Sequence, residues 1–245
     1  MGNGQKEINL SLYDYEQEGL YIILDGSNTL ALTRDNIERT AKKFWEDPRK
    51  IDSKVKAAAE FQRCDFCPLK QTGGLCDAIR PTFPFLEALD KYLSYDQVIA
   101  VYKEAGGGLC ARRSTMQKAL RYLSTLSLVY YCQVTRQYWK HFWGIMPLME
   151  TREIAARLYL NFFYLSKGSK KAANKSISKF RDEITITSRN QVQRMNLVCN
   201  NDAFMNAFVN TQIITDILSF DINELVDEGF NMRQPADLPT PLTLA

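Results

Sequence analysis

The stretch Cys64-Asp65-Phe66-Cys67-Pro68 decides how this chain is held together. Two cysteines spaced as Cys-x2-Cys lie on one tight turn and can bind one soft metal ion, but a closed tetrahedral site needs two further ligands. Cys76 follows shortly after this turn, and a lone Cys132 stands after an apolar helical segment further along the chain. The sequence therefore predicts a four-cysteine metal site made of Cys64, Cys67, Cys76 and Cys132.

The ligand type limits which metal could bind. Four thiolates suit Zn²⁺, a redox-inert tetrahedral ion, and a closed site of this kind contributes folding energy instead of catalysis. An iron–sulfur cluster uses the same number of cysteines, and thiols that bind no metal are a third alternative. The sequence leaves all three open. We interpret the two remaining cysteines, Cys110 and Cys199, as buried thiols.

Composition places the chain among ordinary globular proteins. It has 245 residues, of which 45% are apolar, and its 31 basic and 28 acidic residues give a net charge of only +3. Such a balance does not by itself indicate a nucleic-acid or membrane partner. No run approaches the roughly 18 apolar residues of a membrane helix, and the first residues are polar. We therefore expect a cytoplasmic protein without a membrane partner.

The pattern of apolar residues predicts an α+β fold that is mainly helical. Residues 7–32 alternate as strands do, with turn residues at 25–28, which predicts a small N-terminal antiparallel β-meander. A helix then ends before Pro48. The prediction divides the chain into a meander with its helix (1–48), a helical bundle with the four-cysteine knuckle (49–233) and a flexible tail (234–245).

A polar helix is expected over 50–63, apolar residues at 83–93 have helical spacing, and three further helices complete the predicted bundle. Ser114 and Gln117 have the spacing of a capping box, which predicts a helix over 114–131 that brings Cys132 to its end. Thr151 is expected to cap a second helix, and Asn201 or Asp202 a third. Between these two lies a basic stretch, 167–181, which we interpret as a solvated helix or loop.

The start of the 114–131 helix suggests an alternative function. Its sequence resembles the recognition helix of winged-helix regulators, in which polar and basic residues at a helix start contact bases and phosphates. The candidate DNA-contacting residues are Arg112, Arg113, Ser114, Thr115, Gln117, Lys118 and Arg121. The alternative interpretation is an ordinary helix with a solvated basic face.

Several motifs together resemble an uncharacterised bacterial domain family. They are Cys64-x2-Cys67-Pro68 with Cys76, the run 114–120, Cys132, Met146-Pro147-Leu148 and Glu150-Thr151-Arg152, and the resemblance covers roughly residues 8–165. It implies the architecture and supports Cys132 as the fourth ligand. The chain departs from the family pattern at Tyr131, Gln133 and Ile145, which stand in place of Gly, Pro and His. A chemical role of that histidine in relatives would be lost here.

No catalytic constellation stands out. His141 is the single histidine, and the cysteines are better explained as ligands. We therefore expect a non-catalytic regulatory or interaction module, stabilised by zinc, with a protein as its partner. A DNA-binding regulator and an iron–sulfur redox or iron sensor are the alternatives, and the sequence leaves the oligomeric state open.

Overall fold

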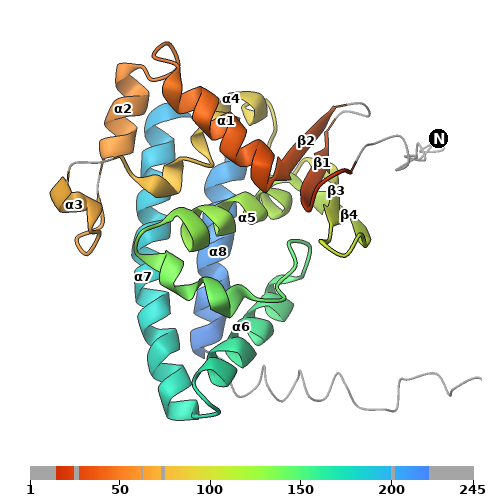
Figure 1. Ribbon diagram of the computed structural model, residues 1–245, viewed down its shortest axis with the longest axis vertical. Helices are drawn as coiled ribbons and strands as arrows, with labels where there is room; N and C mark the ends of the chain where they lie inside the picture. Colours follow the sequence, from red (N-terminus) through yellow and green to blue (C-terminus); the bar gives the residue numbers. More distant parts are fainter. Residues whose placement is uncertain (1–14, 25–27, 62, 73–74, 200–201, 221–245) are drawn as a thin grey trace, which may run out of the picture.

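A computed structural model describes residues 15–24, 28–61, 63–72, 75–199 and 202–220. A four-stranded antiparallel sheet lies at one end of the molecule, and helices form the rest (Figure 1). The predicted α+β, mainly helical fold is confirmed. The predicted tail, 234–245, and the first expected strand residues, 8–12, lie outside the described ranges. Among the described helices, none is long and apolar enough to cross a bilayer.

The sheet combines two distant parts of the chain. Its strands are β1 (Gly19–Ile23), β2 (Thr29–Thr33), β3 (Gln97–Lys103) and β4 (Leu109–Thr115), in the order β2-β1-β3-β4. The N-terminal hairpin predicted within 7–32 is present as β1 and β2, paired with Leu20 opposite Leu32. Strands β3 and β4, however, come from the segment that was assigned to the helical domain. The sheet therefore extends beyond residues 1–48.

The main core lies between the sheet and the helices. Leu20, Ile22 and Ala100, which share one face of the sheet, are completely buried. Helix α5 (Met116–Leu126) packs between this face and α8 (Asp202–Phe220), and its apolar stripe includes Leu120 and Leu123. This central position explains why most of α5 is buried.

Two long helices carry the other end of the molecule. Helix α7 (Lys170–Val198) runs through the basic stretch and through residues 184–187, and it packs against α8. Helix α6 (Thr151–Leu165) precedes it. The shorter elements are α1 (Arg34–Glu46), α2 (Ser53–Glu60), α3 (Leu69–Thr72), η2 (Asp77–Ile79), η3 (Phe83–Phe85), α4 (Leu86–Leu89), η4 (Ser127–Tyr131) and η5 (Thr135–Phe142). The expected helix before Pro48 is confirmed as α1.

The predicted capping box at Ser114 and Gln117 is wrong. Ser114 belongs to strand β4, and α5 begins only at Met116. The backbone carbonyls of Asp96 and Ser94 accept hydrogen bonds from the first amides of α5, those of Met116 and Gln117, so no side-chain cap is needed. A capping box forms instead at the start of α6, where the Glu153 carboxylate accepts a hydrogen bond from the Glu150 amide at 2.7 Å.

Candidate functional site

The first two cysteines lie on a tight turn between α2 and α3, as the spacing predicts. The Cys67 amide donates to the Cys64 carbonyl at 2.9 Å, and the Lys70 amide donates to the Cys67 carbonyl at 3.0 Å as α3 begins. An ion pair between Lys70 and Asp65 holds the outer side of the turn. The backbone therefore brings both thiols to the same side of one short loop.

The other two cysteines come together through contacts between η2 and η4. Cys76 immediately precedes η2, and Cys132 immediately follows η4. The Ser127 hydroxyl donates to the Ala78 carbonyl at 2.5 Å, and the Gln133 amide donates to the Asp77 carboxylate at 2.6 Å. These two hydrogen bonds fix the segment around Cys132 against the segment that follows Cys76.

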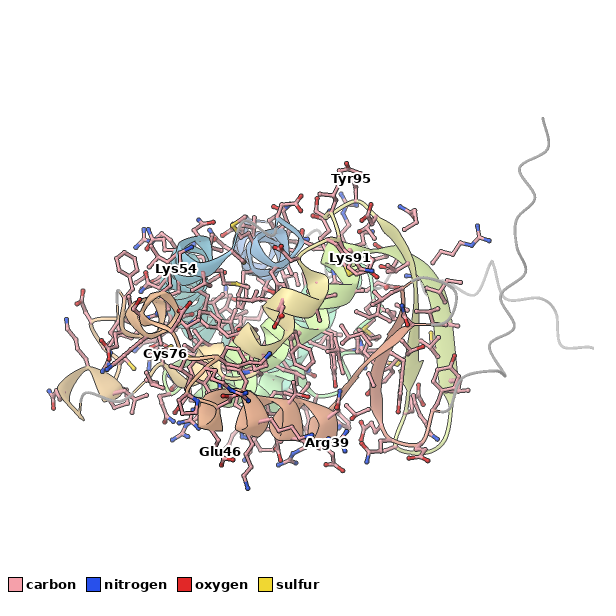
Figure 2. All side chains as sticks on the ribbon, turned by 90° about the horizontal axis from the view of Figure 1, so that it is seen from above. Arg39, Glu46, Lys54, Cys76, Lys91 and Tyr95 are labelled. Atoms are coloured by element: carbon pink, nitrogen blue, oxygen red, sulfur yellow. The ribbon has the colours of Figure 1, made fainter. Side chains whose placement is uncertain are left out.

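All four predicted ligands line one small cavity of about 20 Å³. Cys64 and Cys132 are buried, whereas Cys67 and Cys76 are half-buried. Figure 2 places Cys76 toward the end of the molecule opposite the sheet. The cavity is completed by Arg63, Leu69, Gln133, Val134, Gln191 and Arg194. Residues from four separate segments thus meet at this point, although the cysteines are up to 68 positions apart in the sequence.

Helix α7 supplies hydrogen-bond donors to two of the sulfur atoms. The Asn190 amide donates to Cys64 Sγ at 3.3 Å, and the Gln191 amide donates to Cys76 Sγ at 3.5 Å. Arg194, one turn further on, donates from Nε to the Phe61 carbonyl at 2.8 Å. Sequence reasoning missed these three residues. A signal existed, because they form a polar group on a helix face that otherwise packs into the protein.

The buried thiols are held in their protonated form. Burial raises the pKa of the Cys64 thiol to about 11, although the hydrogen bond from Asn190 lowers it. Burial also raises the pKa of Cys132, against the hydrogen bonds around Thr135 that lower it. Since a metal binds thiolates, metal binding here has to release protons.

The four thiols share a cavity but do not form a closed ligand set. Across the described ranges, no three His, Cys, Asp or Glu side chains are arranged to hold a metal ion. The cavity of about 20 Å³ slightly exceeds the roughly 10–15 Å³ that one water molecule requires. The donor set and the space therefore fit a single ion, provided that the cysteine side chains turn toward a common centre.

The two cysteines outside this group differ from the prediction. Cys110 is exposed on strand β4, where residues 109–113 are exposed on both faces of the strand. The prediction that Cys110 is buried is therefore wrong. Cys199 is half-buried, directly after the end of α7.

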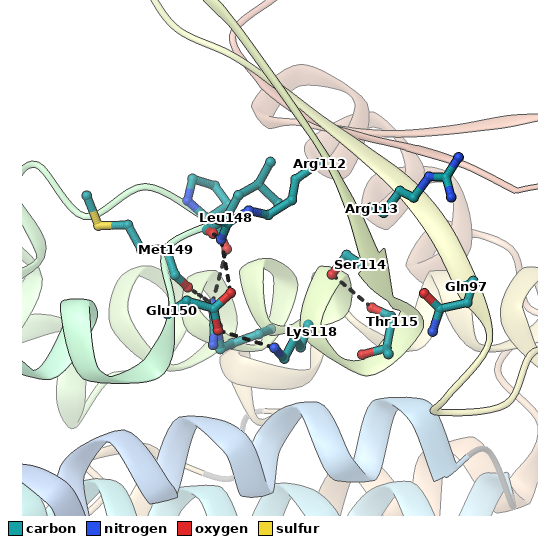
Figure 3. A pocket seen from close by; sticks show the side chains of 11 residues that line it. Gln97, Arg112, Arg113, Ser114, Thr115, Lys118, Leu148, Met149 and Glu150 are labelled. Atoms are coloured by element: carbon teal, nitrogen blue, oxygen red, sulfur yellow. Dashed lines mark hydrogen bonds and ion pairs between the residues drawn. The ribbon is translucent and has the colours of Figure 1, made fainter. Parts of the chain in front are cut away.

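The candidate DNA-contacting residues lie around the start of α5, but they make internal contacts. Arg112 and Lys118 both bind the Glu150 carboxylate, at 3.0 and 3.2 Å (Figure 3). Arg121 is only 5% exposed and donates to the carbonyls of Pro147 and Met149. Gln117 is half-buried, and Arg113 is exposed. DNA contact stays a prediction. The helix that would make this contact, α5, is mostly buried.

His141 is packed within an aromatic cluster. Its ring lies 3.9 Å from the ring of Phe162, and its Nδ1 is 3.2 Å from the Tyr138 carbonyl. Burial lowers its pKa, while the backbone contact to Tyr138 raises it. The interpretation of this residue as a partly packed ring near the aromatic residues is confirmed.

Comparison with known protein families places this chain. A family model described as a domain of unknown function, DUF6901, matches residues 35–232. The chain belongs to this family. The expected resemblance to an uncharacterised domain family is thereby confirmed, and the match to DUF6901 continues well past residue 165, where the motifs ended. No curated protein and no solved structure matches the chain.

Proposed function

We propose that this DUF6901 chain is a non-catalytic interaction module in which Cys64, Cys67, Cys76 and Cys132 bind one structural Zn²⁺. The observation that carries the proposal is the meeting of all four thiols at one cavity. An ion there would link the α2–α3 loop to the junction of η4 and η5. Amide donors such as Asn190 and Gln191 are the kind of outer contact that orients metal-bound sulfur.

The size of the cavity supports a single ion over an iron–sulfur cluster. A cluster carries several iron and sulfide ions, whereas a space of about 20 Å³ holds little more than one water molecule. Zn²⁺ in a closed four-thiolate site requires no further ligand and no open position. The role that follows is structural.

The surroundings of the cysteines give such a metal something to stabilise. Ala78, Cys132 and Val134 form a small apolar cluster separate from the main core, with Cys67 and Cys76 packed against it. The helices on this side are short: α3 has four residues and η2 has three. Small clusters with little buried apolar area often depend on a metal or a disulfide.

A protein partner is supported by the surface above the cysteines. Gln133 and Val134 line the cysteine cavity and also an open groove of about 730 Å³. Tyr130 and Trp139, which line the same groove, are 52% and 49% exposed. Exposed aromatic side chains of this kind are typical of protein interfaces. The metal would hold the segment that presents them.

Metal content and an absorption spectrum test the proposal, on protein purified without oxygen and without added metal. We expect one zinc per chain and no visible band. Cys64→Ser and Cys132→Ser should lower the zinc content, whereas Cys110→Ser, the exposed control, should not. Iron together with sulfide and a visible absorption band would show that the cysteines hold an iron–sulfur cluster in place of zinc. Turnover of a small substrate that is lost on replacing surface polar residues, with the fold intact, would contradict the non-catalytic role.

A further inference from the structure

A second cavity, of about 210 Å³, lies between the start of α5 and the segment that leads into α6. Strand β4 forms one wall, and residues 147–150 form another (Figure 3). It is much larger than the cysteine cavity but smaller than the roughly 300–1,000 Å³ of drug-sized pockets. Its volume suits a small ligand.

The cavity carries an excess of positive charge. Of the described residues that line it, four are cations and Glu150 is the only carboxylate; the cations are Arg112, Arg113, Lys118 and Arg121. Figure 3 shows Glu150 between Arg112 and Lys118, and it binds both. One negative charge is therefore shared by two cations, and two further cations line the same cavity.

Arg121 is the most buried of these cations. It is 5% exposed, and its hydrogen bonds go to neutral acceptors: the carbonyls of Pro147 and Met149 and the hydroxyl of Thr151. Burial lowers the pKa of its guanidinium, and the charge of Glu150 raises it. A buried cation is costly unless an opposite charge lies nearby. An anion in this cavity would provide that charge.

A hydroxyl in the cavity wall also lacks a hydrogen-bond partner. Thr115 lines the cavity, and its buried Oγ1 has no partner among the described residues. The neighbouring Ser114 hydroxyl donates instead to the Thr115 carbonyl at 3.3 Å. Buried polar groups are usually hydrogen-bonded, and a bound water or ion is one explanation of an exception.

We propose that this cavity binds the phosphate group of a small phosphate monoester. Guanidinium groups match the geometry of phosphate oxygens, and an ammonium group adds a point charge. Arg112 and Lys118 would contact the phosphate, Arg121 would contribute its charge from the interior, and the Thr115 hydroxyl would donate one hydrogen bond. Glu150 competes with the ligand, because it occupies the same two cations. The proposal is independent of the zinc site.

A control arginine lies outside the cavity, on helix α1. Arg39 is exposed there, and its Nη2 donates a hydrogen bond to the neutral Asn36 Oδ1 at 3.0 Å. It is not among the residues that line the cavity. Replacing Arg112 or Arg39 by glutamine removes one positive charge from the surface, but only Arg112→Gln removes it from the proposed phosphate site.

Titration calorimetry with inorganic phosphate at low ionic strength tests the proposal. We expect one site per chain, an affinity about tenfold lower for Arg112→Gln and Lys118→Gln, and a change below about twofold for Arg39→Gln, by the usual strength of charge-assisted hydrogen bonds. Glu150→Gln should bind phosphate more tightly, because the competing carboxylate is gone. Circular dichroism and the melting temperature check that each variant is folded.

Three results would overturn the proposal. One is the absence of phosphate binding at concentrations up to about ten millimolar, the affinity scale at which a phosphate group alone is still worth about 3 kcal/mol. Another is equal weakening by Arg112→Gln and Arg39→Gln, which would indicate unspecific attraction. The third is a duplex oligonucleotide that binds far more tightly than phosphate and depends on Arg112, which would indicate contact with nucleic acid. Zinc content decides the first proposal separately.

Discussion

The cysteine cavity and the cationic cavity at the start of α5 are both lined by residues that lie far apart in the sequence. The two cavities differ in how far these residues are already bound to one another. At the first, four similar groups converge, and the described structure provides no closed set of ligands for an ion. At the second, Glu150 already joins Arg112 to Lys118, and backbone carbonyls hold Arg121. Side chains of one chemical type that line the same cavity therefore indicate an external ligand most clearly where few residues of the protein itself bind them.

The largest expected effect is the loss of stability when one of the four cysteines is replaced. If Cys132 binds zinc, Cys132→Ser should remove the metal and lower the free energy of unfolding by about 3–5 kcal/mol, which is roughly 10 °C in melting temperature for a chain of this size. Excess chelator should shift the native protein by a similar amount and should leave Cys132→Ser almost unchanged. Differential scanning calorimetry measures both. If chelator does not change the melting temperature of the native protein, the four cysteines bind no stabilising metal.

The next effect tests whether the cationic cavity is held by its internal partners. Arg121→Met keeps most of the buried volume but leaves the carbonyls of Pro147 and Met149 without their donor. We expect a loss of about 2–4 kcal/mol, the usual cost of breaking a buried charged hydrogen-bond group. Urea unfolding measures it, with Arg189→Met on the exposed side of α7 as the control. Equal stability of the two variants would show that Arg121 is not a structural clamp.

A third effect, on metal affinity, is expected from a residue that is not itself a proposed ligand. Asn190→Ala removes the amide that donates to Cys64 Sγ. Loss of such an outer contact typically lowers metal affinity by 10- to 100-fold. A competition titration against a chromophoric zinc chelator should show a weaker site with the same stoichiometry. Unchanged affinity would mean that Asn190 contributes only packing.

The sequence predicts the two regions to different extents for physical reasons. The spacing of Cys64 and Cys67 restricts their backbone to a turn, and cysteine is rare and chemically distinctive, so the sequence suggests four cysteines that do line one cavity. That they bind a metal stays a prediction. The cationic residues were placed on one helix start, but their partner Glu150 lies 32 positions beyond Lys118. Charged residues are common, so nothing local indicates which pairs meet.

The same reason explains the error at the start of α5. Ser114 and Gln117 satisfy the local pattern of a capping box, but pairing with β3 extends strand β4 through Thr115. Carbonyls from residues 94 and 96 then satisfy the helix amides, which a local pattern cannot reveal. The prediction for Cys110 was wrong for a similar reason, since the local sequence does not show that residues 109–113 of β4 are left exposed on both faces.

The smallest expected effect concerns His141, a titratable group that is packed in an aromatic cluster outside both cavities. Burial lowers the pKa of His141 in the folded protein below its usual value near 6.5. The unfolded chain therefore binds a proton first, and the resulting stability is present above about pH 6.5 and is lost as the pH falls through the folded value. His141→Phe should keep the contact with Phe162 and flatten the decline in unfolding free energy between about pH 7 and pH 5. If the two proteins decline in parallel, burial does not lower the pKa of His141 in the folded protein.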